Sequence, residues 1–234
     1  MIEAQKNYTF MQQSGNAMIY VLLAIALLGF LTVTLSRQND QADGQEISDE
    51  FAELYANELM EYAAAAENVV NMMIATGTDV SELDFVIPSD AAFNAGSHIH
   101  KVFHPSGGGL NYQTSGNQAF LNITGPPTQG WYISTRSNVE WTPSTAQDVI
   151  LTSLYIDLDV CKKINKQITG EEVVYEHGAG ATSTRILFAN FAATQDLDTS
   201  TCPACEGYPA LCIKAPGTTF DSNGGSFYSI IAAQ

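Results

Sequence analysis

The sequence predicts an α+β protein, with a transmembrane helix, an amphipathic helix packed on an antiparallel β-sheet, and a C-terminal region braced by disulfides. Three observations predict this class. Residues 17–35 are apolar throughout, residues 46–75 repeat apolar side chains at helical spacing, and the remainder holds short β-branched and aromatic runs separated by turn residues. The predicted divisions are a leader or cytoplasmic segment at 1–16, a transmembrane helix at 17–36, a polar joint at 37–45 and an exported α+β domain at 46–234.

The apolar run at 17–35 contains no charged residue, proline, asparagine or glutamine. As a helix it would be about 28 Å long, which matches the hydrocarbon thickness of a bilayer. A secretion signal has a shorter apolar core of about 7–15 residues, followed by a cleavage site between small residues. The residues that follow, "SRQND", offer no such site. We therefore expect a single-pass anchor in the inner membrane, with the C-terminal domain in the periplasm or outside the cell.

Charge indicates which partners to expect. The chain has 25 acidic and 9 basic residues and a net charge of −16, and almost all of the acidic excess follows Arg37. Such a surface repels phosphate groups, so nucleic acid is excluded as a partner. The membrane is the expected partner. The short leader carries both Glu3 and Lys6, and we place it inside because it is short.

Enzyme motifs are missing from the sequence. It contains no G-x-S-x-G elbow, phosphate loop, H-E-x-x-H or dinucleotide fingerprint. The glycines at 107–109 lack the following lysine and helix start that phosphate binding requires, so they indicate a turn. We expect no enzymatic activity and no cofactor.

Two helices and several strands are predicted in the exported domain. The helix at 46–75 ends at Gly77, and a shorter helix at 157–170 carries Cys161. The predicted strands lie at 98–103, 110–113, 119–124, 131–137, 149–155, 184–191 and 227–232.

The four cysteines all lie in the last third of the chain, at Cys161, Cys202, Cys205 and Cys212. An even number in an exported domain predicts two disulfides, with three possible pairings. The alternative is a zinc site, because C-x-x-C in "CPACEGYPALC" is also a metal-binding spacing.

The order of these parts resembles that of type IV pilins and the related pseudopilins of secretion systems. In that family a peptidase cuts after a glycine just before the apolar run, and the new N-terminal helix packs with its neighbours. The matching residue is Gly15, which would make Asn16 the new N-terminus. Tyr20 stands where the family usually has a glutamate that pairs with a neighbouring amino terminus, although some minor, tip-type subunits lack it. The leader's end, "FMQQSG", also lacks the family's basic residues.

Three further pieces, "KVFHPSGGG", "VCKKIN" and "SFYSIIAAQ", are similar to uncharacterised pilin-like proteins of alphaproteobacterial type. The resemblance implies a structural subunit that assembles with copies of itself or with other membrane or secretion subunits. Small residues in the apolar run permit close helix packing in lipid. The residues of this predicted assembly helix are Ala17, Tyr20, Ala24 and Gly29.

Two other functions remain open from the sequence. The chain is alternatively a single-pass accessory subunit of a larger membrane complex, or a periplasmic metal-binding module. The module would use His98, His100 and His104, because imidazoles are ligands for zinc, copper or nickel. A second candidate metal site would hold calcium on acidic side chains near the C-terminal loop. Its candidate ligands are Asp196, Asp198 and Glu206.

Overall fold

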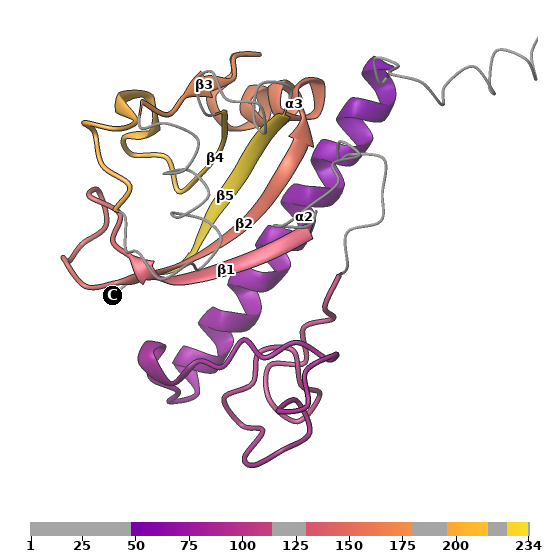
Figure 1. The fold of residues 1–234 in the computed structure, drawn as a ribbon, viewed down its shortest axis with the longest axis vertical. Helices are drawn as coiled ribbons and strands as arrows, with labels where there is room; N and C mark the ends of the chain where they lie inside the picture. Colours follow the sequence, from indigo (N-terminus) through magenta and orange to yellow (C-terminus); the bar gives the residue numbers. More distant parts are fainter. Residues whose placement is uncertain (1–47, 114–129, 179–195, 215–223, 234) are drawn as a thin grey trace, which may run out of the picture. The chain divides into compact units, whose positions relative to one another are not determined.

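The computed structural model describes residues 48–113, 130–178, 196–214 and 224–233 of the 234-residue chain. The chain divides into two compact units, Met1–Glu46 and Ile47–Gln234, and every described residue belongs to the second. Its elements are α2 (Asp49–Ala75), η2 (Val80–Glu82), β1 (Gly130–Ser137), β2 (Asp148–Asp157), α3 (Leu158–Thr169), β3 (Tyr175–Glu176), η3 (Pro203–Cys205), β4 (Ala210–Lys214) and β5 (Gly224–Ala232) (Figure 1).

Helix α2 confirms the predicted amphipathic helix. Asp49 and Glu50 lie in its first turn, where negative charge stabilises the positive end of the helix dipole. Thr76 is the C-cap that follows the last helical residue, Ala75, and Gly77 then adopts a φ of 105°, a conformation that favours glycine. The buried face consists of Ala52, Ala56, Leu59, Tyr62, Ala63, Ala66, Val70 and Met73.

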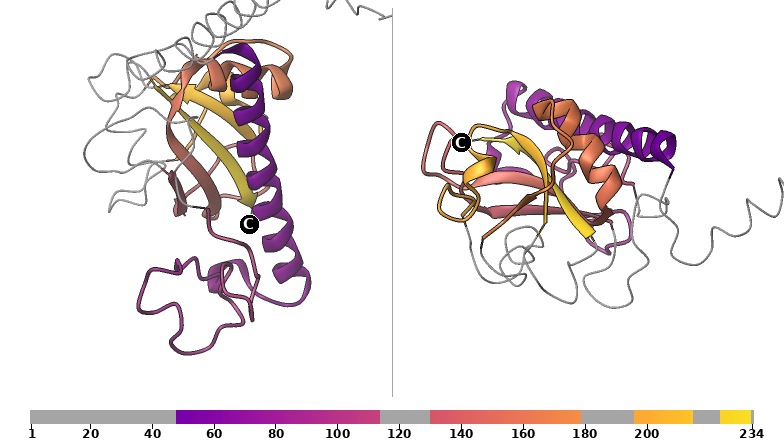
Figure 2. Two further views of the ribbon diagram at one scale, coloured as in Figure 1. Left: turned by 90° about the vertical axis from the view of Figure 1, so that its right-hand side faces the viewer. Right: turned by 90° about the horizontal axis from the view of Figure 1, so that it is seen from above.

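The sheet has five strands in the order β1-β2-β5-β4-β3. The predicted antiparallel pairing is correct for β1, β2, β5 and β4, but β3 runs parallel to β4. A long connection at 177–209 separates those two strands, and parallel neighbours require such a connection rather than a hairpin. The sheet is therefore mixed. Both α2 and α3 cover the same face of it (Figure 2).

Strand β2 lies at the centre of the core and is buried on both faces. Val149 and Leu151 pack toward the helices, whereas Ile150 and Leu154 join a second cluster on the other side of the sheet. A bulge at Tyr155, which has a φ of 62°, shifts the pairing with β5 and returns Ile156 to the helix side. The aliphatic side chains of this one strand therefore pack in the apolar clusters on both faces of the sheet.

The strand predictions were right in three places and wrong in two. Strands β1, β2 and β5 confirm the runs at 131–137, 149–155 and 227–232. Residues 98–103 and 110–113 are not strands: the first forms turns, with one isolated bridge between Asp84 and Lys101. The predicted strands at 119–124 and 184–191 lie outside the described residues. Strands β3 and β4 were not predicted.

Lys101 lies in the segment 98–103, which was predicted to be a strand, and its side chain is buried. It is only 4% exposed, and its ammonium donates hydrogen bonds to the carbonyl oxygens of Ala92 at 2.6 Å, Phe93 at 2.9 Å and Ala95 at 2.5 Å. A buried charge needs such partners. The segment itself is held in turns by hydrogen bonds from the Lys101 amide to the His98 carbonyl at 3.1 Å and from the His104 amide to the Lys101 carbonyl at 3.2 Å.

Both disulfides predicted from the cysteine count are present, and they resolve the pairing. Cys161 of α3 is bonded to Cys212 of β4, and Cys202 is bonded to Cys205 in the turn at η3. No free cysteine remains, so no thiolate is available for the alternative zinc site.

In the part of the chain that the structure describes, no helix has the length and apolar composition needed to cross a membrane. The predicted transmembrane helix at 17–36 lies outside that part.

Candidate functional site

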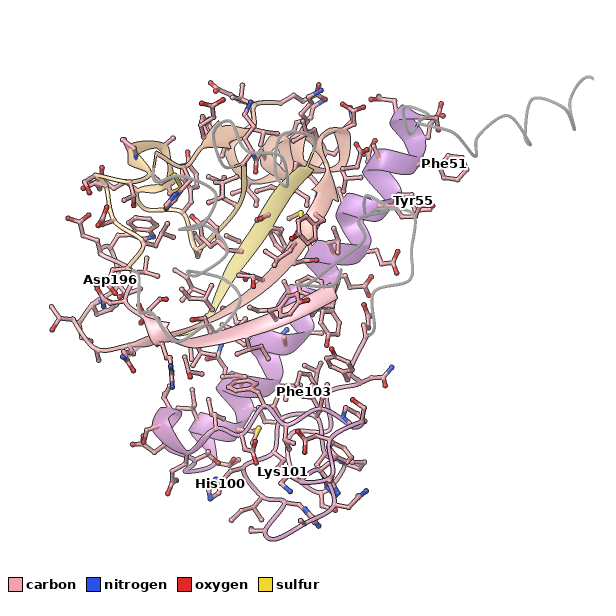
Figure 3. The ribbon with its side chains drawn as sticks, viewed as in Figure 1. Phe51, Tyr55, His100, Lys101, Phe103 and Asp196 are labelled. Carbon is pink, nitrogen blue, oxygen red and sulfur yellow. A yellow bond between two sulfur atoms is a disulfide. The ribbon has the colours of Figure 1, made fainter. Side chains whose placement is uncertain are left out.

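Apolar side chains on the first turns of α2 are exposed or half-buried in the part of the chain that the structure describes. Phe51 is 51% exposed and Leu54 57% exposed, and the ring of half-buried Tyr55 stacks on Phe51 with centroids 6.3 Å apart. Both aromatic side chains point away from the sheet (Figure 3). We call Phe51, Leu54 and Tyr55 the α2 patch. Contiguous exposed apolar patches are one class of protein-interaction surface.

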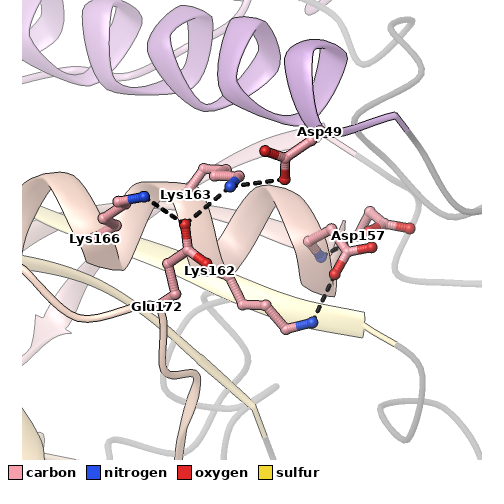
Figure 4. A network of polar contacts seen from close by, with 7 residues as sticks. Asp49, Asp157, Lys162, Lys163, Lys166 and Glu172 are labelled. Carbon is pink, nitrogen blue, oxygen red and sulfur yellow. Dashed lines mark hydrogen bonds and ion pairs between the residues drawn. The ribbon is translucent and has the colours of Figure 1, made fainter.

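Ion pairs fix the start of α2 to α3 (Figure 4). The ammonium of Lys163 lies 2.7 Å from a carboxylate oxygen of Asp49 and 2.9 Å from one of Glu172. Lys166 contacts the same Glu172 oxygen at 2.7 Å. Hydrogen bonds from Lys166 and then Lys163 lower the pKa of Glu172 to about 2, and the Asp49 carboxylate raises the pKa of Lys163. Glu172 and Lys163 are therefore charged at neutral pH.

Helix α3 is in turn fixed to the sheet by a buried asparagine beside the disulfide. The side-chain amide of Asn165 donates to the carbonyl oxygens of Val173 at 2.6 Å and Cys212 at 2.7 Å, and its oxygen accepts from the Cys212 amide at 2.8 Å. Asn165 is completely buried. The Cys161 sulfur also lies so close to Gly225 of β5 that a side chain at that position would collide with it. The end of α2 that carries the α2 patch is thus connected to the sheet through α3.

The three predicted metal-binding histidines do not converge. The rings of His98 and His104 are stacked, with centroids 3.9 Å apart and planes at 15°. His100 instead lies near Glu82, with 4.0 Å between its Nε2 and a carboxylate oxygen. The Nδ1 atoms of His98 and His100 are buried without a hydrogen-bond partner. Parallel stacked imidazoles direct their lone pairs side by side rather than at one ion.

Acidification is expected to destabilise this stack. Burial, His98 and Lys101 lower the pKa of His104 below its usual 6.5. The unfolded chain therefore takes up a proton at a higher pH than the folded chain, and stability falls as the pH drops below about 6.5. The loss of unfolding free energy between pH 7.5 and pH 5 should be smaller in His104→Gln, measured by urea unfolding at each pH. A matched change, His100→Gln, lies outside the stack; an equal reduction there would contradict the assignment.

The acidic residues proposed for calcium are engaged in loop structure. The carboxylate of Asp196 accepts a hydrogen bond from the backbone amide of Asn138 at 2.9 Å. One carboxylate oxygen of Asp198 accepts from the hydroxyls of Ser200 and Thr201, and these bonds hold the pKa of Asp198 below its usual value. Glu206 is exposed. Across the described ranges, no group of three or more histidine, cysteine or acidic side chains is arranged to hold a metal ion.

The predicted processing site and assembly helix lie outside the described residues. They comprise Gly15, Asn16, Ala17, Tyr20, Ala24 and Gly29.

Sequence reasoning missed a loop at 138–148 that is held by hydrogen bonds of its own side chains. The side-chain amide of Asn138 donates to the carbonyl oxygens of Ser144 and Ala146. The buried carboxylate of Asp148 accepts from the backbone amide of Val139 at 2.8 Å. Asn, Thr, Ser and Asp commonly form such local bonds, so the composition of "NVEWTPSTAQD" was the available signal.

Comparison with known protein families, with curated proteins and with solved structures finds no match to this chain.

Proposed function

We propose that this chain is a pilin-like or pseudopilin-like subunit, anchored in the inner membrane by residues 17–36, that assembles through its N-terminal helix with copies of itself. The observation that carries the proposal is the α2 patch. It lies at the start of a helix of 27 residues that follows the apolar run after only a short polar joint. The domain at 46–234 would lie in the periplasm or outside the cell.

The location of the patch supports assembly at this end of α2. Ala52 and Ala56, on the opposite face of the same turns, are fully buried, so the helix is already held to its own domain without Phe51 or Leu54. The small residues Ala24 and Gly29 of the predicted assembly helix permit close packing in lipid. The α2 patch would add a separate apolar contact with a neighbouring subunit, beyond the polar joint at 37–45.

The connections from α2 through α3 to the sheet support the same function. Lys163 joins the first residue of α2 to α3, and the Cys161–Cys212 disulfide joins α3 to β4. A force on the N-terminal helix would then reach the sheet through these ion pairs and this covalent bond as well as through the packed face of α2. A subunit extracted from a membrane, or held in a polymer, requires such a connection.

Replacing Leu54 by serine is expected to weaken assembly without unfolding the domain. Burying a leucine contributes about 1.5–3 kcal/mol, which corresponds to a decrease of about tenfold to a hundredfold in each subunit contact. Assembled and unassembled chain would be separated by sedimentation of solubilised membranes. Met72→Ser is the matched control, because Met72 is 53% exposed near the other end of α2. An equal loss of assembly in both variants would contradict a specific role for the patch.

Processing is tested by the mass of the mature chain. Cleavage after Gly15 predicts a chain beginning at Asn16. An intact Met1 in assembled material would contradict pilin-type processing.

A second candidate function, a single-pass accessory subunit of a larger membrane complex, is favoured by Tyr20. The tyrosine cannot supply the carboxylate that usually pairs with a neighbour's new amino terminus. In this case the α2 patch would contact a different protein, and the chain would copurify with unrelated membrane subunits.

A further inference from the structure

A pocket of 410 Å³ lies at a distance from the α2 patch, between α2, the 141–143 turn and the end of β5. It is an open depression rather than an enclosed cavity, and its volume lies within the range of about 300–1,000 Å³ of small-molecule sites. Glu67 and Asn71 of α2 form one wall, Trp141 and Pro143 contribute to another, and Ile230 and Ala232 of β5 also line it. Glu67 is about 18 Å further along the helix than Tyr55.

Trp141 is held in place before any ligand arrives. Its indole N–H donates to the carbonyl oxygen of Tyr208 at 3.2 Å. The hydroxyl of the next residue, Thr142, donates to the Val139 carbonyl oxygen at 2.8 Å and contacts the Asp148 carboxylate at 3.1 Å. A ring fixed in this way presents a flat apolar surface at little entropic cost to binding.

Glu67 and Asn71 supply polar groups that no other described residue engages. They are four residues apart, so they lie on one side of α2, and both are exposed. Within the described part of the chain neither side chain has a hydrogen bond or ion pair. The carboxylate only accepts hydrogen bonds, whereas the amide both donates and accepts.

We propose that this pocket binds a sugar ring of a neutral carbohydrate, with one face against Trp141 and hydroxyls toward Glu67 and Asn71. A pyranose has an apolar C–H face and hydroxyls that donate and accept, so it satisfies the indole, the carboxylate and the amide together. Acidic ligands are disfavoured by the net charge of −16. A basic group would satisfy Glu67 but would leave the Asn71 amide donor unused. The site is independent of the proposed assembly function.

Tryptophan fluorescence tests the proposal in the full-length chain, kept in a detergent without a sugar head group. Trp131 is only 7% exposed, so a change on titration reports mainly on Trp141. The probes are methyl glycosides of glucose, galactose, mannose and N-acetylglucosamine, with glycerol as a hydroxyl control and arginine amide as a basic control. We expect at least one glycoside to bind with a dissociation constant in the millimolar range.

Two helix variants then locate the site. Asn71→Ala should weaken that glycoside about fivefold, the effect of one hydrogen bond of about 1 kcal/mol. Asn68→Ala is the matched control, because Asn68 is an exposed amide on the same helix that does not line the pocket. The proposal is overturned if no glycoside changes the fluorescence, if glycerol acts equally, if only arginine amide binds, or if both variants weaken binding equally.

Discussion

Changing Cys161 and Cys212 together to alanine is expected to lower the free energy of unfolding by about 4 kcal/mol. The disulfide closes a loop between residues separated by 51 positions, and its removal frees that loop in the unfolded chain. A loss of this size is a large part of the stability of a typical domain. Urea unfolding of the variant and the unchanged protein, under non-reducing conditions, measures the difference.

The Cys202–Cys205 disulfide provides the control. Both pairs are completely buried, so replacement by alanine removes similar packing. The second pair spans a separation of only 3, for which the same loop-closure relation gives about half the loss. A larger loss at Cys202 and Cys205 would contradict the role assigned to the bond between α3 and β4.

Changing Asn165 to leucine is expected to lower the free energy of unfolding by at least about 2 kcal/mol, because each buried polar group left unpaired costs about 1–3 kcal/mol and both backbone groups of Cys212 are buried. The substitution removes the partners of the Cys212 amide, the Cys212 carbonyl and the Val173 carbonyl. Leucine is similar in size, so the loss reflects hydrogen bonding more than a cavity. Urea unfolding again gives the value.

Gln167→Leu is the matched control for this change. Gln167 lies on the exposed side of the same helix, and its amide donates to Asn57 at 2.8 Å. Exposed substitutions of this kind usually change stability by less than about 0.5 kcal/mol. Similar losses in the two variants would show that Asn165 does not hold α3 to the sheet as described.

Much of the fold could be predicted because its periodicity is local. Both helices follow a repeat of three to four, and three of the five strands combine β-branched residues with nearby turns. The turns at 98–113 could not be predicted, since the alternation in "HIHKVF" resembles a strand and the burial of Lys101 depends on carbonyls from residues 92–95. Strand β3 has only two residues, too few for a pattern.

The candidate site was predictable only in part. The apolar spacing correctly predicted helix α2, and Phe51 and Leu54 belong to that apolar repeat. The structure instead buries Ala52 and Ala56 at this end, beside α3, and leaves the larger side chains exposed. Small residues let α3 approach closely, which depends on a helix more than 100 positions away in the sequence. Hydrophobic spacing alone could not distinguish the two faces.

Photo-crosslinking from position 54 in native membranes tests the central claim most directly. A photoreactive phenylalanine analogue would replace Leu54 in one sample and Met72 in the other. Assembly through the start of α2 predicts abundant products of twice the chain mass from position 54 and few from position 72. Monomer alone from position 54, or equal products from both positions, would contradict it.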